Sequence, residues 1–246
     1  MSELDPQDLT VIIPARDAGM TVGATISSLV GQRAGKPRII LVDDGSTDGT
    51  AAVAAQIGLG ADLLVISSAG EGPGAARNRG LAAVTTPLVA FCDADDQWVG
   101  DRLGADLACF NSDENLEVLL GRSLFVADDE ELLRCIRFDG PDRAALIPSV
   151  GATTMRTSVF ERVGLVDGSL HNYEDYEWLY RARDCGTRVV SHDRVVQISR
   201  VRPDSTSRRN PPSPSDLLAV IHRSVLRRRT AGVLRADRLD QLGRTL

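Results

Sequence analysis

Acidic side chains gather directly after two short apolar runs of the chain, residues 38–42 and 88–92. The five carboxylates are those of Asp43, Asp44, Asp93, Asp95 and Asp96. In an open parallel sheet, ligands bind at the carboxyl ends of the strands. Five carboxylates at one edge would repel each other unless a cation lay among them, and a hard divalent ion takes such oxygen ligands and shares them with substrate phosphates. The sequence therefore predicts a divalent metal ion, Mn²⁺ or Mg²⁺, at this edge.

An aspartate after a strand also has a purely structural use, since it caps helices and forms turns. We expect that role for Asp48 and Asp101. It is a weak explanation for Asp93, Asp95 and Asp96 together. Three carboxylates within four residues at the end of a buried strand are costly without a partner.

The elements that would position these acids alternate between strand and helix. Strands are predicted at 10–14, 38–42, 62–66 and 88–92, separated by helices at 22–32, 51–57 and 75–83. Strands that are apolar throughout indicate a parallel sheet covered on both faces. Beyond residue 110 the order is less regular, with strands at 116–120, 123–126 and 188–190 and helices at 157–163, 174–185 and 216–229. The prediction is an α/β fold with a mainly parallel central sheet, helices on both faces and a C-terminal helical segment.

Composition narrows the class of protein. The chain has 246 residues, 43% of them hydrophobic, and a net charge of −6, which argues against nucleic acid as a partner. The N-terminus lacks the features of a signal peptide, and no run approaches the roughly 18 apolar residues that span a bilayer. The cysteines, which form no CxxC pair, are interpreted as reduced and mostly buried; they are Cys92, Cys109, Cys135 and Cys185. We expect a cytoplasmic protein without a transmembrane segment, and the sequence leaves its oligomeric state open.

The C-terminal part of the chain is basic. Residues 216–246 contain seven Arg and three Asp, a net charge of +4, so the rest of the chain carries −10. The four arginines within the expected helix 216–229 are interpreted as its solvated face. Residues 208–215, with three prolines, are expected to form a linker or an ordered loop.

Five segments carry a family resemblance. They are residues 11–17 (VIIPARD), 42–48 (VDDGSTD), 74–80 (GAARNRG), 91–96 (FCDADD) and 173–178 (YEDYEW). In this order they resemble glycosyltransferase family 2, whose members share the GT-A nucleotide-sugar fold. The resemblance implies a GT-A catalytic domain over residues 1–207, with a nucleotide-binding half at about 9–110 and an acceptor half at about 111–207. Residues 208–246 would form a linker and a helical tail.

The resemblance also implies roles at a donor site. The residues it assigns to the nucleotide sugar are Pro14, Ala15, Arg16, Asp17, Asp44, Arg77, Asp93, Ala94, Asp95 and Arg202. Asp44 would accept a hydrogen bond from the base, such as the imide N–H of uracil, and Asp93 would contact the ribose or the phosphates. Asp95 would ligate the metal ion. Arg77 would steady the base or the diphosphate, and a surface position on its helix is the equally weighted alternative.

Three positions depart from the family pattern. Arg16 stands where relatives often have an aromatic residue that stacks on the base, although a guanidinium plane also stacks. Asp17 stands in a slot that often holds Asn, and both residues suit a turn. Arg202 stands where many relatives have His. An Arg does not ligate a metal ion, but it binds phosphate directly by charge-assisted hydrogen bonds.

Glu174 and Asp175 precede an expected helix. Carboxylates there are favoured by the helix dipole, so capping is one interpretation. The other is a base that deprotonates an acceptor hydroxyl. The resemblance assigns the base to Asp175, and a base opposite the leaving diphosphate favours single displacement with inversion. It also assigns Gly151, Ala152 and Glu174 to the pocket for the sugar and acceptor.

The predicted function is an inverting, metal-assisted hexosyltransferase that moves a sugar from a nucleoside-diphosphate sugar, UDP-linked, to an unidentified hydroxyl acceptor. A sugar-1-phosphate nucleotidyltransferase is an alternative, but residues 15–20 contain one Gly where it needs a glycine-rich loop. A dinucleotide-dependent oxidoreductase would need GxGxxG after the first strand, which is absent. The other alternative is a non-catalytic protein that binds a nucleotide sugar. The presence of both Asp95, for the metal ion, and Asp175, for the base, argues against it.

Overall fold

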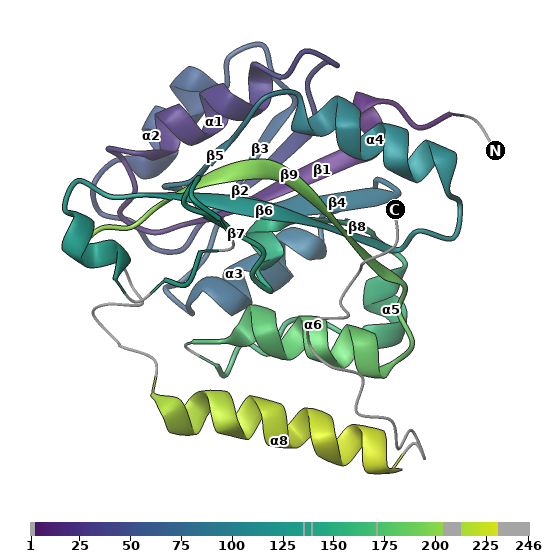
Figure 1. The fold of residues 1–246 in the computed structure, drawn as a ribbon. Coiled ribbons are helices and arrows are strands. Elements are labelled where there is room, and N and C mark those ends of the chain that lie inside the picture. The colour runs from purple at the N-terminus through teal and green to yellow at the C-terminus, as the bar shows by residue number, and fades with distance from the viewer. Residues whose placement is uncertain (1–2, 135, 139, 171, 204–212, 231–246) are drawn as a thin grey trace.

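A central sheet lies between two layers of helices in the computed structural model, which describes residues 3–134, 136–138, 140–170, 172–203 and 213–230. Figure 1 shows one layer above the sheet, made of α1 (Val22–Val30), α2 (Thr50–Ile57) and α4 (Arg102–Ser112). The layer below is made of α3 (Pro73–Leu81), α5 (Val159–Val163) and α6 (Glu174–Asp184). The last helix, α8 (Pro214–Thr230), lies beneath α6. The expected α/β fold is confirmed.

The first half of the sheet is parallel. Its strands are β1 (Leu9–Ala15), β2 (Arg38–Asp43), β3 (Leu63–Ser67) and β4 (Leu88–Phe91), in the order β3-β2-β1-β4. The order continues with β8 (Thr153–Arg156), β6 (Val118–Val126), β9 (Val189–Arg200) and β5 (Gln97–Trp98), and β7 (Ala144–Ala145) pairs with β6. Strand β8 is antiparallel to both β4 and β6, whereas β6 and β9 are parallel. Short 3-10 helices lie at Pro6–Asp8, Glu130–Leu133 and Val150–Ala152.

Strands that are buried on both faces divide most of the core into two large clusters. Val11 and Ile13 of β1 belong to the cluster under α1 and α4, and Ile12 between them belongs to the cluster over α3, α5 and α6. This follows from the alternation of side chains along a strand. In the lower cluster Trp178 is fully buried and its ring stacks on Phe160 at 4.7 Å. Trp178 is therefore a packing residue.

The second half differs from the sequence-based expectation in three elements. The two strands expected at 116–120 and 123–126 are the single strand β6, and the strand expected at 188–190 is the start of the twelve-residue β9. Residues 151–156, expected as a loop, form a 3-10 turn and the strand β8. Strand β9 was underestimated because its polar residues 191–194 break the apolar pattern. Residues 192–194 lie at an irregularity in the register between the pairs Leu120–Ser191 and Arg122–Val195, and the pairing with β6 resumes beyond it.

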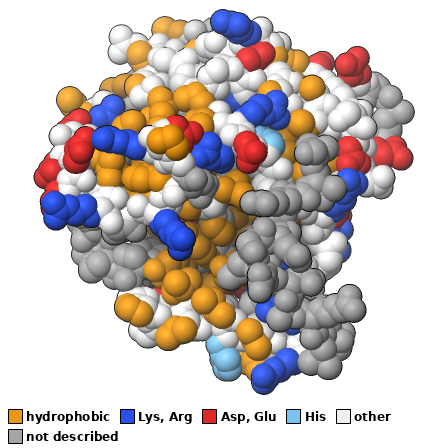
Figure 2. Space-filling view, in the orientation of Figure 1, with side chains coloured by type: hydrophobic (Ala, Val, Ile, Leu, Met, Phe, Trp, Pro, Cys, Tyr) orange, Lys and Arg blue, Asp and Glu red, His pale blue; other side chains and the backbone are white. Residues whose placement is uncertain are grey.

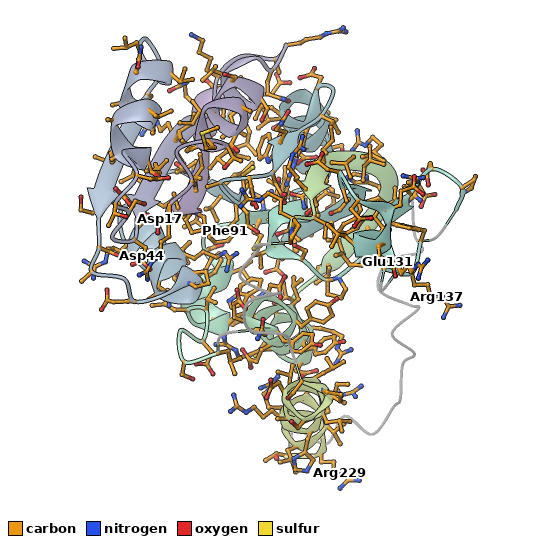
Figure 3. The ribbon with its side chains drawn as sticks, turned by 90° about the vertical axis from the view of Figure 1, so that its left-hand side faces the viewer. Asp17, Asp44, Phe91, Glu131, Arg137 and Arg229 are labelled. Carbon is orange, nitrogen blue, oxygen red and sulfur yellow. The ribbon has the colours of Figure 1, made fainter. Side chains whose placement is uncertain are left out.

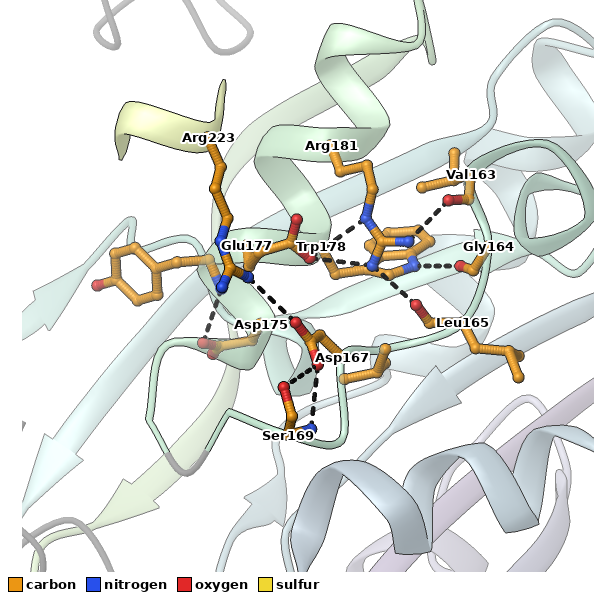
Figure 4. Close-up of polar contacts among 12 residues, drawn as sticks. Val163, Gly164, Leu165, Asp167, Ser169, Asp175, Glu177, Trp178, Arg181 and Arg223 are labelled. Atoms are coloured by element: carbon orange, nitrogen blue, oxygen red, sulfur yellow. Dashed lines mark hydrogen bonds and ion pairs between the residues drawn. The ribbon is translucent and has the colours of Figure 1, made fainter. Parts of the chain in front are cut away.

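The solvated face expected for the arginines of α8 holds for Arg223 and Arg229, which are exposed, but not for Arg227 and Arg228, which are partly buried. Arg227 donates hydrogen bonds to Glu177 at 3.0 Å and to Asp184 at 3.2 Å. The exposed Arg223 pairs with Asp167 at 3.2 Å (Figure 4). Acids of α6 and of the segment before it thus provide partners for the arginines of this helix. The outer side of α8 includes the exposed Leu218 and Leu226, and the lower edge of Figure 2 shows apolar side chains beside Arg and His there.

Two expectations from composition can be compared with the described residues. None of the helices in the described ranges is both long enough and apolar enough to cross a bilayer. Cys92 is buried, Cys109 is partly buried and Cys185 is exposed, all three as free thiols. Burial is therefore wrong for Cys185, which ends helix α6. Cys135 and most of the expected linker at 208–215 lie outside the described residues.

Candidate functional site

The site lies where the carboxyl ends of β1, β2 and β4 meet the start of β8. The parallel register pairs Ala15 with Asp43, and the backbone N–H of Asp44 donates to the carbonyl of Ala15 at 2.8 Å. The antiparallel pairing of Ala90 with Thr154 brings the segment before β8 to the same edge. The predicted convergence of segments from both halves of the chain is therefore present. Figure 3 shows Asp17 and Asp44 side by side at this end of the molecule.

Asp17 is a turn residue that joins the loops after β1 and β2. Its backbone is left-handed, with φ of 47°, a conformation that Asp and Asn tolerate better than most residues. Its carboxylate accepts hydrogen bonds from the N–H of Thr47 at 2.8 Å and from its hydroxyl at 3.2 Å, and its own N–H donates to Ser46. Asp48 accepts from Gly19, so it is a turn residue as expected.

Asp44 is buried at the centre of a glycine-rich loop. Its Oδ1 accepts hydrogen bonds from the Ser68 hydroxyl and from the N–H groups of Gly70 and Glu71, both at 3.0 Å, and its Oδ2 accepts from Gly72 at 2.7 Å. Burial raises the pKa of this carboxyl, but these hydrogen bonds outweigh burial and hold the pKa below its ordinary value. Asp44 is therefore ionised at neutral pH and shapes the loop.

Pro14, Ala15 and Arg16 form the other wall of this loop. Ala15 is buried and contributes its backbone, whereas Arg16 is exposed. The Nη1 atom of Arg16 lies 3.1 Å from the position that a Cβ on Gly70 would occupy. A side chain at residue 70 would therefore crowd the guanidinium, a planar group of the kind that can stack on a nucleotide base.

The three carboxylates after β4 have different surroundings. Asp96 is buried and accepts hydrogen bonds from the Ser199 hydroxyl and the Arg200 N–H, both at 3.1 Å, so it ties this loop to the end of β9. Asp95 pairs with Arg202 at 3.1 Å, with 24% of its side chain exposed, and Asp93 is 44% exposed. The backbone between them is buried at Ala94. Asp93 and Asp95 are therefore the two accessible acids of the loop.

Arg77 connects this loop to helix α6. The residue is 6% exposed, and its guanidinium donates to Glu174 at 2.7 Å and to Asp93 at 2.8 Å. Burial lowers the pKa of Arg77, but the charges of Asp93, Glu174 and Asp175 outweigh it, so the pKa lies above its ordinary value. The alternative of a surface helix position for Arg77 is wrong.

Asp175 lies in the first turn of α6, beside this cation. The residue before the helix, Tyr173, has a left-handed backbone with φ of 62° and makes no capping hydrogen bond with its side chain. Asp175 accepts from the N–H of Tyr176 at 2.8 Å. Burial and the neighbouring Glu174 raise the pKa of Asp175 to about 7, against the opposing charge of Arg77. A carboxyl with a pKa near neutrality suits general-base chemistry.

The residues assigned to the sugar pocket are held by a buried cation that the sequence analysis did not identify. Gly151 and Ala152 are buried, and the carbonyl of Gly151 accepts from Arg102 at 2.9 Å. Arg102 also donates to the Thr153 carbonyl and to Asp106, and lies over the Trp98 ring at 4.1 Å. The apolar spacing of residues 103, 107 and 110 after the capping Asp101 would have indicated this helix.

The carboxylates at this site suit a divalent ion that takes one or two ligands from the protein and the others from water and phosphate oxygens. Within the described ranges, no group of three or more His, Cys, Asp or Glu gathers around one point. Burial and the negative charge of Asp93 raise the pKa of Asp95 despite its pairing with Arg202, so Asp95 remains short of positive charge. Mg²⁺ and Mn²⁺ are commonly held by one or two carboxylates together with substrate phosphates. Asp95, with Asp93 beside it, fits such an ion.

Known proteins were compared with the chain. Residues 10–181 match the profile of glycosyl transferase family 2. The succinoglycan biosynthesis protein ExoO of Rhizobium meliloti (strain 1021) is 31% identical over 222 residues, which cover 82% of this chain and 63% of ExoO. The succinoglycan biosynthesis protein ExoU of the same organism is 36% identical over 106 residues, 42% of this chain and 31% of ExoU. The chain thus spans about a third to two thirds of these relatives.

A solved structure extends the comparison of the fold. The 1–349 segment of S. aureus TarS, in complex with UDP-GlcNAc, superposes with a TM-score of 0.72 at 20% identity, covering 89% of this chain and 66% of that one. At that identity the likeness concerns the fold alone. The family match covers most of this chain and includes every motif described above except the segment around Arg202. On this basis, the chain belongs to glycosyl transferase family 2.

Proposed function

We propose that this protein is an inverting glycosyltransferase that moves a sugar from a nucleoside-diphosphate sugar to an acceptor hydroxyl, with Asp175 as the base. The observation that carries the proposal is the chain of contacts from Asp93 through Arg77 to Glu174. It holds the first turn of α6, and with it Asp175, next to the accessible acids at the end of β4. Donor binding is assigned to residues 9–110 and acceptor binding to residues 111–207.

The choice of Asp175 over its neighbours rests on their partners. Glu174 is tied to Arg77, while Glu177 accepts from Arg181 through Oε2 and from Arg227 through Oε1. Both carboxylates are thus already paired with guanidinium groups. Asp175 has the raised pKa instead, so it is the carboxylate best suited to take the proton from an acceptor hydroxyl. Attack from its side, opposite the diphosphate, gives single displacement with inversion.

A uridine nucleotide is the proposed donor. Asp44 remains an acceptor at neutral pH, and its Oδ2 accepts one hydrogen bond, from Gly72, so it has capacity for an imide N–H. The guanidinium of Arg16, which follows β1 and lies against Gly70, offers a plane for the base. Among solved structures of this fold, TarS binds UDP-GlcNAc, and a mannosyltransferase of Pyrobaculum calidifontis, with a TM-score of 0.61, binds GDP-Man and Mn²⁺. Donors therefore differ among proteins of this fold.

Asp95 and Asp93 would hold the divalent ion. When bound, that ion would neutralise the charge that develops on the departing diphosphate. Arg202 would bind the diphosphate oxygens directly, because its guanidinium lies at this loop and forms strong hydrogen bonds with phosphate. Gly151 and Ala152 would line the sugar side of the pocket, with their backbone fixed by Arg102.

The test is a set of incubations with UDP- and GDP-sugars, Mn²⁺ and a panel of hydroxyl acceptors, analysed for products. Release of nucleoside diphosphate that is abolished in Asp175→Asn is the expected result, with the anomeric configuration inverted in the product. Release of pyrophosphate from nucleoside triphosphate and sugar phosphate would identify a nucleotidyltransferase instead. Tight binding of a nucleotide sugar without turnover of any acceptor would favour a binding protein.

A further inference from the structure

The ion pair between Asp95 and Arg202 occupies the position where the proposed metal ion would bind. Nη2 of Arg202 lies 3.1 Å from Oδ2 of Asp95. Arg202 lies two residues beyond the end of β9, and the last residues of that strand are fixed because Asp96 accepts from the Ser199 hydroxyl and the Arg200 N–H. The loop after β4 therefore contains both Asp95, which pairs with Arg202, and Asp96, whose hydrogen bonds position the segment that leads to Arg202.

The charges around Asp95 explain why an arginine lies there. The Asp95 side chain is only 24% exposed and lies two residues from the second acid Asp93, so a carboxylate there needs a cation beside it. Asp93 has its own cation in Arg77, which lies on the other side of the loop. Arg202 thus gives Asp95 a positive neighbour in the absence of ligands. A guanidinium held at Oδ2 of Asp95 repels a divalent ion that approaches the same carboxylate, so the two cations compete for it.

The pair is also accessible enough to be exchanged. The side chains of Arg202 and Asp95 are 29% and 24% exposed, so solvent weakens their attraction. A diphosphate carries more negative charge than one carboxylate and accepts bidentate hydrogen bonds from a guanidinium. A nucleoside diphosphate beside this loop would therefore compete with Asp95 for Arg202 and would bind the guanidinium more strongly.

We propose that Arg202 is an internal counter-cation of Asp95 in the donor-free protein, and that a nucleoside diphosphate releases it and so makes Asp95 available to the metal ion. This inference rests on the proposed function, since it assumes that a nucleoside diphosphate binds here. It makes Arg202 a residue that sets the order of binding. Linkage then requires metal ion and nucleotide to strengthen each other's binding by the same factor.

The experiment measures free Mn²⁺ by electron paramagnetic resonance during titration of the wild type, Arg202→Ala, Arg202→Lys and Arg200→Ala, with and without UDP. Arg200 is the matched control, because it lies two residues away, has the same charge and pairs with the exposed Asp128. Its Ala variant keeps the N–H that Asp96 needs. Asp95→Asn identifies the Mn²⁺ bound at this carboxylate.

Without UDP, Arg202→Ala should bind Mn²⁺ about tenfold more tightly than the wild type, a factor typical of coupled sites. The Lys and Arg200 variants should stay near the wild type. Addition of UDP should tighten Mn²⁺ binding in the wild type and much less in Arg202→Ala. Equal or weaker Mn²⁺ binding by a folded Arg202→Ala protein would overturn the proposal. If UDP fails to bind any variant, the proposed function and the release step fail, while the titration without UDP still decides the counter-cation role.

Discussion

Arg77 and Glu174 share a 2.7 Å hydrogen bond that joins helix α3 to the first turn of α6, although the residues are 97 positions apart in the chain. The same guanidinium holds Asp93 at the end of β4. One buried side chain thus connects the proposed donor half with the proposed base. The geometry of the site depends on this cation more than on any single apolar contact.

Replacement of Arg77 by Gln should therefore cost about 3–5 kcal/mol of unfolding free energy, the range for removing one partner of a buried ion pair. Urea unfolding measures it. Arg79→Gln is the matched control, because Arg79 lies on the same helix but forms an exposed pair with Glu71, which should be worth less than about 1 kcal/mol. Similar losses in the two variants would contradict the role given to Arg77.

Asp175→Asn should lower turnover by about 10²- to 10⁴-fold, the usual contribution of a general base. Asn keeps the size of the side chain and an oxygen that accepts from the Tyr176 N–H. Donor affinity, measured by calorimetry, should be retained because Asp175 lies on the acceptor side. Transfer at the wild-type rate would show that the base is another group.

The pH dependence of kcat/KM should show a fall on the acid side with a midpoint near 7. A base acts only when it is ionised, and burial with the neighbouring Glu174 raises the pKa of Asp175 to about 7. Activity should therefore be lost as the pH falls below this value. In Arg77→Gln the midpoint should move to higher pH, since the opposing positive charge is gone. A profile flat from pH 5 to 8 would be incompatible with Asp175 as the base.

Stability should show the cost of this raised pKa. The protonated form of Asp175 is favoured in the folded state, so the carboxyl's contribution is greatest below its ordinary pKa of 3.8 and is lost as the pH rises to about 7. A shift of this size corresponds to about 4 kcal/mol at most, and we expect about 1–2 kcal/mol because the side chain is partly exposed to solvent. Asp175→Asn should thus stabilise the protein at pH 8 and have little effect at pH 3. Thermal unfolding at both pH values decides this.

Asp44→Ala should weaken nucleotide binding and also destabilise the loop. Calorimetry should show a loss of about 1–3 kcal/mol of donor affinity, as for a hydrogen bond to a charged group. The N–H groups of Gly70, Glu71 and Gly72 would lose their acceptor, so the melting temperature should fall as well. Asp44→Asn, which keeps Oδ1 as an acceptor, should restore much of the stability but not the affinity. Unchanged donor affinity in the Ala variant would remove Asp44 as a base contact.

The first half of the fold could be predicted because its strands are short, apolar and regularly spaced. Strand β1, predicted at 10–14, spans Leu9–Ala15, and helix α2, predicted at 51–57, spans Thr50–Ile57. In the second half helix α6 was predicted as well, but the strands were not, because polar residues stand in that part of the sheet. Strand β9 contains His192, Asp193 and Arg194, which no apolar pattern marks as a strand. Pairing with β6 across a long sequence separation determines that structure.

The site residues were identifiable by type, but their partners were not. The acids after β2 and β4 indicated the location of the site. The partners of these acids come from distant segments, which the sequence does not bring together. Asp44 accepts from the loop at Gly72, and Asp96 accepts from the end of β9 at Arg200. The buried Arg102 was missed for the same reason, since a single arginine in a sequence gives no sign that it will hold the carbonyls of residues 151 and 153.

The ion pairs that arginines of helix α8 form with the rest of the protein change its long-range electrostatic attraction for ions. From the sequence, an acidic body and a basic tail would form a large electric dipole. In the structure, Arg223 and Arg227 of that tail contact Asp167, Glu177 and Asp184 of the body. Opposite charges at such distances cancel beyond about one Debye length, roughly 8 Å at physiological ionic strength. Long-range attraction of anions to this helix is therefore much weaker than its arginine content suggests.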